Sequence, residues 1–419
     1  MDANGVVPGR PPRRQAAFGF IFATAIMNAL SFGLMIPVLP ALLKSFVGGD
    51  AASAALWQTV FAATWGAVQF FSGPVLGMAS DRFGRRPVLL VSIFGLAGDF
   101  LFMAFAPNLW WLFLGRILNG LTASSNSTAN AYVADVTAPQ DRARRFGIMG
   151  SAFSIGLVLG PVAGGFLADI NLRLPFMVAA GLALVNGLFG LFILPESLPP
   201  EKRAETFHWK GANPLAGLSF LRGHGELLGL ATMAFLFQLS MNVWPMTFVL
   251  YTQFRYHWTI GIIGLVMMIA SGGGAAVQLT LVGTVVRHLG ERGAVMLGAA
   301  CGCAAMAIYG WAPNGALYFL GMPFSVCSGF MMPGIMGLMS RRVAGNQQGR
   351  LQGANQGLQG ISSILGPMMF GPALSFALRR DASLHTPGLA FYLAAAAIGL
   401  IFLLSLQIRA SEPAIVTPE

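Results

Sequence analysis

The chain has 419 residues, of which 55% are hydrophobic and only 10% are charged, and its formal net charge is +10. A soluble domain carries about 25% charged residues, so this chain lacks the charge to cover a surface that faces water. Apolar stretches of about 20 residues, long enough to cross a ~30 Å hydrocarbon layer, recur along its length. The composition therefore excludes a soluble globular protein and predicts an all-α integral membrane protein.

Twelve membrane-spanning helices are predicted from the apolar stretches. The first follows a basic segment, but its apolar run is too long for the core of a signal peptide, and we interpret it as an uncleaved span. In chain order, the predicted spans lie at about residues 17–43, 55–79, 87–106, 109–134, 146–168, 174–194, 225–252, 259–286, 293–311, 316–338, 351–377 and 388–407.

The basic residues are distributed unevenly between the two sides of this predicted topology. Nineteen of the 25 Lys and Arg residues fall on the side that holds both termini, five fall on the opposite side, and Arg116 lies inside a span. This bias follows the positive-inside rule and places both termini in the cytoplasm. The positive net charge thus reflects topology, and we expect the lipid bilayer, not nucleic acid, as a partner.

A polar segment after the sixth span divides the chain into two halves. We expect an N-terminal six-helix half at 1–194, a cytoplasmic linker loop at 195–222 and a C-terminal six-helix half at 223–419. "GMASDRFGRR" from Gly77 has a weak echo in "GTVVRHLGER" from Gly283, and the Gly-Pro pair of "GLVLGPVAGG" recurs in "SSILGPMMFG" at the same separation. Two parallel six-helix halves, with a substrate path between them, are one way in which secondary transporters are built.

These motifs carry a family resemblance. The chain resembles the major facilitator superfamily and, more narrowly, the bacterial tetracycline/H+ antiporters, through "GLMIPVLPALL", "GPVLGMASDRFGRRPVLL", "LGRILNG", "GLVLGPVAGG" and "QQGRLQG", over nearly its whole length. The resemblance implies twelve transmembrane helices in two pseudo-symmetric halves, and export of tetracycline-like or other amphiphilic drugs by alternating access. It also implies protons as the coupled ion, the proton gradient as energy source without a cofactor, a bacterial inner membrane and function as a monomer.

The charged loop after the second span is interpreted as a conformational latch. Asp81 is an acid at the inner surface, where helix N-termini attract anions. The resemblance implies that Asp81 caps the start of the eleventh span and that Arg85 pairs with Asp135. For Arg82 and Arg86, a role as simple topology anchors stays open. The residues of the predicted latch are Gly77, Asp81, Arg82, Gly84, Arg85, Arg86 and Asp135.

The fifth span contains small residues spaced four apart, which permit close packing, and a proline that bends the helix. The resemblance implies the antiporter-type helix motif, which would seal the interface between the halves against leak. An ordinary close-packing helix is the alternative. The motif comprises Gly156, Gly160, Pro161, Gly164 and Gly165.

Asp99 and Arg116 are the ionisable residues that lie clearly inside predicted spans, where charge is costly unless it is used. At about 1.5 Å per residue the two lie at nearly the same depth, so that they could pair or face one wet cavity. The resemblance implies that they couple transport to protons; a static ion pair is the alternative. Where the resembled antiporters carry other titratable side chains, this chain has Asn28, Gly274 and Gly302.

Uncharged polar side chains at mid-membrane depth are candidates for the substrate cavity. About half of them are expected to serve only as hydrogen bonds between helices. The candidates are Asn28, Ser31, Asn119, Gln238, Asn242, Gln278, Asn355 and Gln359.

Other classes of function are disfavoured by missing motifs. The sequence has no GxxxxGK[ST] loop for ATP-driven transport and neither HExxH nor GxSxG, so we expect no enzyme. Its three cysteines fall within spans and are interpreted as packing residues, without a metal site. A facilitator or proton symporter that imports a small nutrient on the same fold is the alternative function, and it would accumulate substrate inside cells.

Overall fold

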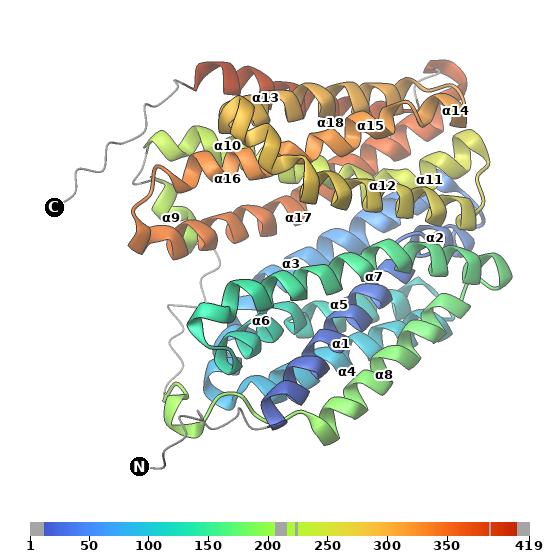
Figure 1. Ribbon diagram of the computed structural model, residues 1–419. Coiled ribbons are helices and arrows are strands. Elements are labelled where there is room, and N and C mark those ends of the chain that lie inside the picture. Colours follow the sequence, from blue (N-terminus) through green and yellow to red (C-terminus); the bar gives the residue numbers. More distant parts are fainter. Residues whose placement is uncertain (1–11, 206–215, 223–224, 385–386, 409–419) are drawn as a thin grey trace, which may run out of the picture. The chain divides into compact units, whose positions relative to one another are not determined.

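The computed structural model describes residues 12–205, 216–222, 225–384 and 387–408, and these residues form helices without any strand. The predicted all-α fold is therefore confirmed (Figure 1). In chain order the helices are α1 Pro12–Met35, α2 Leu39–Phe46, α3 Ala51–Phe83, α4 Arg85–Phe105, α5 Leu109–Thr122, α6 Ser125–Val136, α7 Arg142–Ile170, α8 Leu174–Ile193, α9 Ala216–Arg222, α10 Gly225–Met241, α11 Val243–Tyr256, α12 Ile260–Thr280, α13 Val282–Trp311, α14 Gly315–Tyr318, α15 Gly321–Cys327, α16 Met331–Ser340, α17 Gln348–Leu384 and α18 Leu389–Gln407.

Ten helical segments of the described residues are long and apolar enough to cross a membrane. The other two of the twelve predicted spans fall on α3, whose apolar run is interrupted by polar side chains such as Gln58, and on α5 with α6. A break at Ala123 and Ser124 separates α5 from α6. The Ser124 hydroxyl lies 3.1 Å from that of Ser127 and 2.9 Å from that of Thr128. The Ser127 hydroxyl also donates to the Ser124 carbonyl oxygen at 3.1 Å, a bond of the kind that competes with the helical ladder.

The chain divides into two compact units. Unit 1 comprises Met1–Leu42, Val68–Asn213 and Ile260–Met268, and unit 2 comprises Leu43–Ala67, Pro214–Thr259 and Ile269–Glu419. The beginning of α3 thus belongs to unit 2, and the beginning of α12 belongs to unit 1.

The predicted boundaries at 1–194, 195–222 and 223–419 stay a prediction. Residues 206–215 of the expected linker lie outside the described residues, as do 1–11 and 409–419 at the termini whose cytoplasmic location is predicted.

In unit 1, α1 packs against α7 and α8, and α4 packs against α5 and α8 (Figure 1). Their apolar faces exclude lipid and water from a shared core, within which the Tyr132 hydroxyl donates a hydrogen bond of 2.8 Å to the carbonyl oxygen of Pro195. The buried core side chains are Phe20, Ile21, Ala25, Leu89, Ile93, Ala129, Tyr132, Val133, Met149, Ala152 and Leu194.

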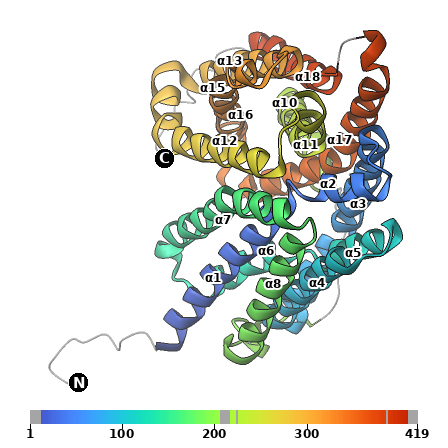
Figure 2. The same ribbon diagram turned by 90° about the vertical axis from the view of Figure 1, so that its right-hand side faces the viewer.

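In unit 2, α10 packs against α16, α17 and α18, as Figure 2 shows. An aromatic cluster joins α11, α13 and α14 of this unit. Tyr309 stacks on Tyr318 with ring centroids 4.2 Å apart, and Trp244 meets the Tyr309 ring edge-on at 5.3 Å. The Tyr251 hydroxyl donates to the Tyr309 carbonyl oxygen at 2.8 Å. This rigid cluster holds α11 and α13 in place beside the helices that line the cavity described below.

Candidate functional site

A buried ion pair joins α4 to α5. Arg116 Nε donates to Asp99 Oδ1 at 3.1 Å, and Arg116 Nη2 pairs with Asp99 Oδ2. Asp99 is 0% exposed and Arg116 is 6% exposed. A Cβ atom added at Gly115 would lie 2.9 Å from Asp99 Oδ1, so only glycine leaves room for the carboxylate there. The structure thus brings together the two intramembrane charges that the sequence singled out.

This arrangement has a clear chemical consequence. A fork of two parallel charge-assisted bonds is the strongest geometry that arginine and carboxylate can form. Protonation of Asp99 would remove the charge that Arg116 neutralises and would leave a buried guanidinium without a counter-ion. The buried guanidinium therefore depends on the charge of this one carboxylate.

Arg85 is the centre of the charged loop between α3 and α4. Its Nη1 lies 2.6 Å from Asp81 Oδ1, and its Nε donates to Asp135 Oδ2 at 3.1 Å. The same Nη1 donates to Ser80 Oγ at 3.2 Å. Arg85 thereby ties the ends of α3, α4 and α6 together within unit 1. The predicted capping of the eleventh span by Asp81 stays a prediction.

Glu196 completes this cluster, and the sequence analysis missed it. Its carboxylate accepts hydrogen bonds from the backbone N–H groups of Arg85 and Arg86, at 2.8 and 3.2 Å. Gly84 precedes them with φ of 106°, a conformation that L side chains rarely adopt, and a Cβ there would meet the Glu196 carboxylate. An acid two residues after the end of the sixth predicted span is the signal that could have found it, since Asp81 stands in the same position after the second span.

The other predicted latch residues have more peripheral places. Arg86 donates through Nη2 to the carbonyl oxygen of Leu191, 2.5 Å away, at the end of α8. The Arg82 guanidinium lies over the Phe83 ring at 5.6 Å from its centroid. A Cβ at Gly77 would meet open space, so no close approach within the described residues requires glycine there.

The loop has a counterpart in unit 2 with reversed charges. Gly290 interrupts α13 with φ of 70° and ψ of 172°, close to the 106° and 161° of Gly84. The next residue, Glu291, pairs with Arg341. The separations from Gly84 to Gly290, from Arg85 to Glu291 and from Asp135 to Arg341 all equal the separation from Gly77 to Gly283. The repeat predicted from two motifs thus extends to backbone conformation. It also extends to an ion pair in which the acidic and basic residues are exchanged between the two units.

The glycines of the antiporter-type motif lie on two faces of α7. Gly156, Gly160 and Gly164 face α1, and a Cβ at Gly160 would lie 2.6 Å from the Gly33 Cα. Gly165 faces Ile260 and Gly261 of α12 instead, and the backbone carbonyl of Pro161 lies against Gly264 of the same helix. Such close approach requires residues without side chains.

Asp169, at the end of α7, was also missed. Its Oδ2 accepts a hydrogen bond of 3.1 Å from the backbone N–H of Gly261, in the first turn of α12. A carboxylate at a helix N-terminus satisfies a free N–H group and interacts favourably with the helix dipole. Asp169 therefore fixes the start of α12 to α7 within unit 1.

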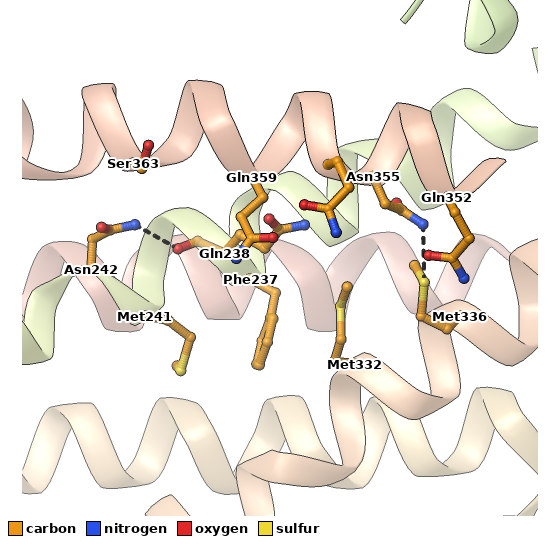
Figure 3. Close-up of a pocket in the computed structure, with 11 residues that line it drawn as sticks. Phe237, Gln238, Met241, Asn242, Met332, Met336, Gln352, Asn355, Gln359 and Ser363 are labelled. Carbon is orange, nitrogen blue, oxygen red and sulfur yellow. Dashed lines mark hydrogen bonds between the residues drawn. The ribbon is translucent and has the colours of Figure 1, made fainter. Parts of the chain in front are cut away.

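A cavity of about 570 Å³ lies among α10, α16 and α17 of unit 2 (Figure 3). Among the described residues that line it, none carries a charge, six are amides and three are methionines. Figure 3 shows the amides of α17 pointing toward the methionines and Phe237. The lining residues are Phe237, Gln238, Met241, Asn242, Met332, Met336, Gln352, Asn355, Gln356, Gln359 and Ser363.

Four of the eight predicted cavity residues come together here, namely Gln238, Asn242, Asn355 and Gln359. Asn242 serves as a link between helices, because its Nδ2 donates to the carbonyl oxygens of Gln238 and Ser362 at 2.9 and 3.2 Å.

Two other lining amides keep buried oxygens, Gln238 Oε1 and Asn355 Oδ1, without a hydrogen-bond donor in the described part of the chain. The methionines of α16 were missed, since a Met in an apolar span gives no sign of facing a cavity.

The remaining predicted cavity residues lie elsewhere. Asn28 and Ser31 are on α1 and Asn119 is on α5, all in unit 1, while Gln278 is exposed on α12. None of these four is among the residues that line the cavity of unit 2.

Long apolar helices, a buried ion pair and a polar cavity between helices are typical of a multi-pass membrane transport protein. The profile of the Major Facilitator Superfamily matches residues 21–367, and the chain belongs to this superfamily and, within it, to the group of the tetracycline resistance proteins.

The chain is 37% identical to the tetracycline resistance protein, class C, of Escherichia coli, over 83% of this chain and 87% of that protein. The class B protein of Escherichia coli is 31% identical over 92% of this chain and 96% of that protein. Among solved structures, a point mutant of the nucleoside transporter NupG superposes with a TM-score of 0.77 at 15% identity, over 93% of this chain and 99% of that one, which is a likeness of fold.

Proposed function

We propose that this protein is a secondary transporter of the bacterial inner membrane that exports tetracycline-like or other amphiphilic drugs in exchange for protons, and that it is not an enzyme. The observation that carries the proposal is the Asp99–Arg116 pair, since a buried carboxylate held by a single arginine can take up and release a proton as its surroundings change. The relatives at 37% and 31% identity, both tetracycline resistance proteins, support the drug as cargo.

The two structural devices of unit 1 suit such a cycle. The Arg85 cluster holds the α3–α4 loop in one conformation, and we propose that it acts as a latch on the cytoplasmic side, where both termini would lie. The glycine faces of α7 allow close packing against α1 and the start of α12, which supports a role in sealing the protein against leak. With both functions inside one chain, the monomer would suffice.

The test uses inside-out membrane vesicles with an acidic interior reported by a quenched dye. Addition of tetracycline should release protons from the vesicles and restore fluorescence, and vesicles without the protein should stay dark. Asp99→Asn should abolish the response. Ser92→Ala is the matched control, because Ser92 is also buried on α4 but its hydroxyl only bonds the Val88 carbonyl oxygen of its own helix.

The same assay separates the alternative. The second candidate is a facilitator or a proton symporter that imports a small nutrient, and Asn28, Gly274 and Gly302, which stand where the resembled antiporters carry titratable groups, favour the facilitator. Silence toward tetracycline and a panel of amphiphilic cations, with uptake of a nutrient into whole cells, would establish that function instead. A fluorescence response that survives in Asp99→Asn would remove the ion pair from the coupling mechanism.

A further inference from the structure

We propose that a second pocket of this protein, formed by Lys44, Arg255 and His257, binds a phosphate group. Two sources offer such a group, a lipid headgroup and free phosphate, and both present the same negative charge and acceptor oxygens. The site is separate from the cavity among α10, α16 and α17 and goes beyond the proposed transport. The pocket has a volume of about 460 Å³, and its lining residues, all in unit 2, are Lys44, Gln253, Phe254, Arg255, His257 and Pro313.

The pocket brings together basic residues that are far apart in the sequence. Lys44 lies in the last turn of α2 and Arg255 in the last turn of α11. They follow the first and the seventh predicted spans, on the side that the positive-inside rule leaves poor in basic residues, with only five of the 25 Lys and Arg. Two of these five line one pocket, where like charges repel each other unless an anion lies between them.

No acid in the described part of the chain neutralises these two cations. The lining residues include no carboxylate, and neither Lys44 nor Arg255 forms an ion pair with a described acid. The C-terminal end of each helix dipole contributes about half a negative charge, so that roughly one positive charge remains for a ligand.

The pocket also holds its hydrogen-bond donors in place. Arg255 Nε donates to the carbonyl oxygen of Ala312 at 3.2 Å, which fixes a planar guanidinium whose fork matches two oxygens of a phosphate group. Among the described residues other than glycine, only His257 has a positive φ, of 54°. Such a conformation costs free energy and is concentrated at functional sites, and here it belongs to the third basic side chain of the pocket.

The experiment follows acylation of the Lys44 amine by an uncharged, water-soluble active ester, with the purified full-length protein and peptide mass spectrometry as readout. The sequence has only two other lysines, Lys202 and Lys210, both in the predicted cytoplasmic linker, and they serve as internal standards. A phosphate group bound against Lys44 covers its amine. At about ten times the dissociation constant of the ligand, acylation of Lys44 should slow about tenfold while the standards react as before.

Two arms of the experiment distinguish the sources of the phosphate group. In the first, the protein is in lipid-free detergent, and inorganic phosphate is compared with sodium chloride at the same ionic strength. In the second, nanodiscs of phosphatidylcholine are compared with nanodiscs that also contain phosphatidylglycerol, whose phosphate has no cation beside it. Slower acylation in the first arm alone identifies free phosphate as the ligand, and in the second alone a lipid headgroup. Slower acylation in both arms shows that the shared group suffices.

Arg255→Gln and His257→Asn should each remove most of the protection of Lys44. Asparagine is chosen at position 257 because it tolerates a positive φ. Arg380→Gln is the matched control, because it removes the same charge on the same predicted side from a residue that does not line the pocket, and it should keep the protection. Unfolding of each variant by SDS, compared with the wild type, shows that a loss of protection is local.

Unchanged acylation of Lys44 in both arms would overturn the proposal. Equal slowing by sodium chloride would do the same, because the effect would then be screening, and so would protection that both pocket variants retain. Neither a drug nor a proton gradient is present in these measurements. Their failure therefore contradicts the phosphate site alone, and silent vesicles in the transport assay contradict the antiport alone.

Discussion

The Asp99–Arg116 pair allows a test that separates charge balance from packing. Both side chains are buried, and both oxygens of the carboxylate face the guanidinium. Asp99→Leu would leave the arginine buried without a counter-ion, which should lower the free energy of unfolding by about 3–5 kcal/mol. Replacing both partners with leucine removes the buried charge, and such replacements are often neutral or stabilising, so the double variant should recover nearly all of that loss.

The assay is reversible unfolding of the purified protein by titration with SDS, followed by tryptophan fluorescence. The double variant should unfold at nearly the wild-type SDS fraction, and the single variant much earlier. The proton-exchange response should be absent from both. If Asp99→Leu proved as stable as the double variant, the guanidinium would not depend on this carboxylate. A double variant that still exchanged protons would reduce the pair to a packing element.

Three further outcomes follow from the loops and helix ends. Gly84→Ala should cost about 1–3 kcal/mol in SDS unfolding because its φ is positive, whereas Gly77→Ala, which meets open space, should not destabilise. Glu291→Arg should destabilise unit 2 slightly, by about 0.2–1 kcal/mol, and adding Arg341→Glu should restore the ion pair and the stability; a double variant no better than the single one would rule out the contact. Asp169→Leu should cost about 0.5–2 kcal/mol as a lost helix cap, while Asp169→Asn, which keeps an acceptor, should cost less; equal losses would contradict the hydrogen bond to α12.

Composition predicted the all-α fold, and the depth of charged residues within the predicted spans pointed to the buried ion pair. Helix rise alone placed Asp99 and Arg116 at one level, and the structure joins them. The hydrogen bond between Arg85 and Glu196 could not be predicted from depth, because the two residues are far apart in the sequence. Only the fold brings the end of α8 next to the α3–α4 loop.

The cavity shows where such reasoning stops. Gln238, Asn242 and Asn355 look alike in the sequence, yet Asn242 donates its amide hydrogens to two backbone carbonyl groups. The side-chain oxygens of the other two have no donor within the part of the chain that the structure describes. That difference depends on which backbone groups surround each side chain. The division of α3 and α12 between the two units is likewise a property of packing, which no local pattern encodes.

The charge-reversed loops imply that the two halves descend from one ancestral half and have since specialised. At the repeat separation, Asp99 and Arg116 correspond to Ala305 and Met322, which cannot hold a proton. The cavity amides Asn355 and Gln359 correspond to Met149 and Phe153. Under the proposed function, the half that contains Asp99 and Arg116 provides the energy coupling. Substitutions in α10, α16 and α17 leave this pair unaltered, so the cavity of unit 2 can diverge in sequence without loss of coupling.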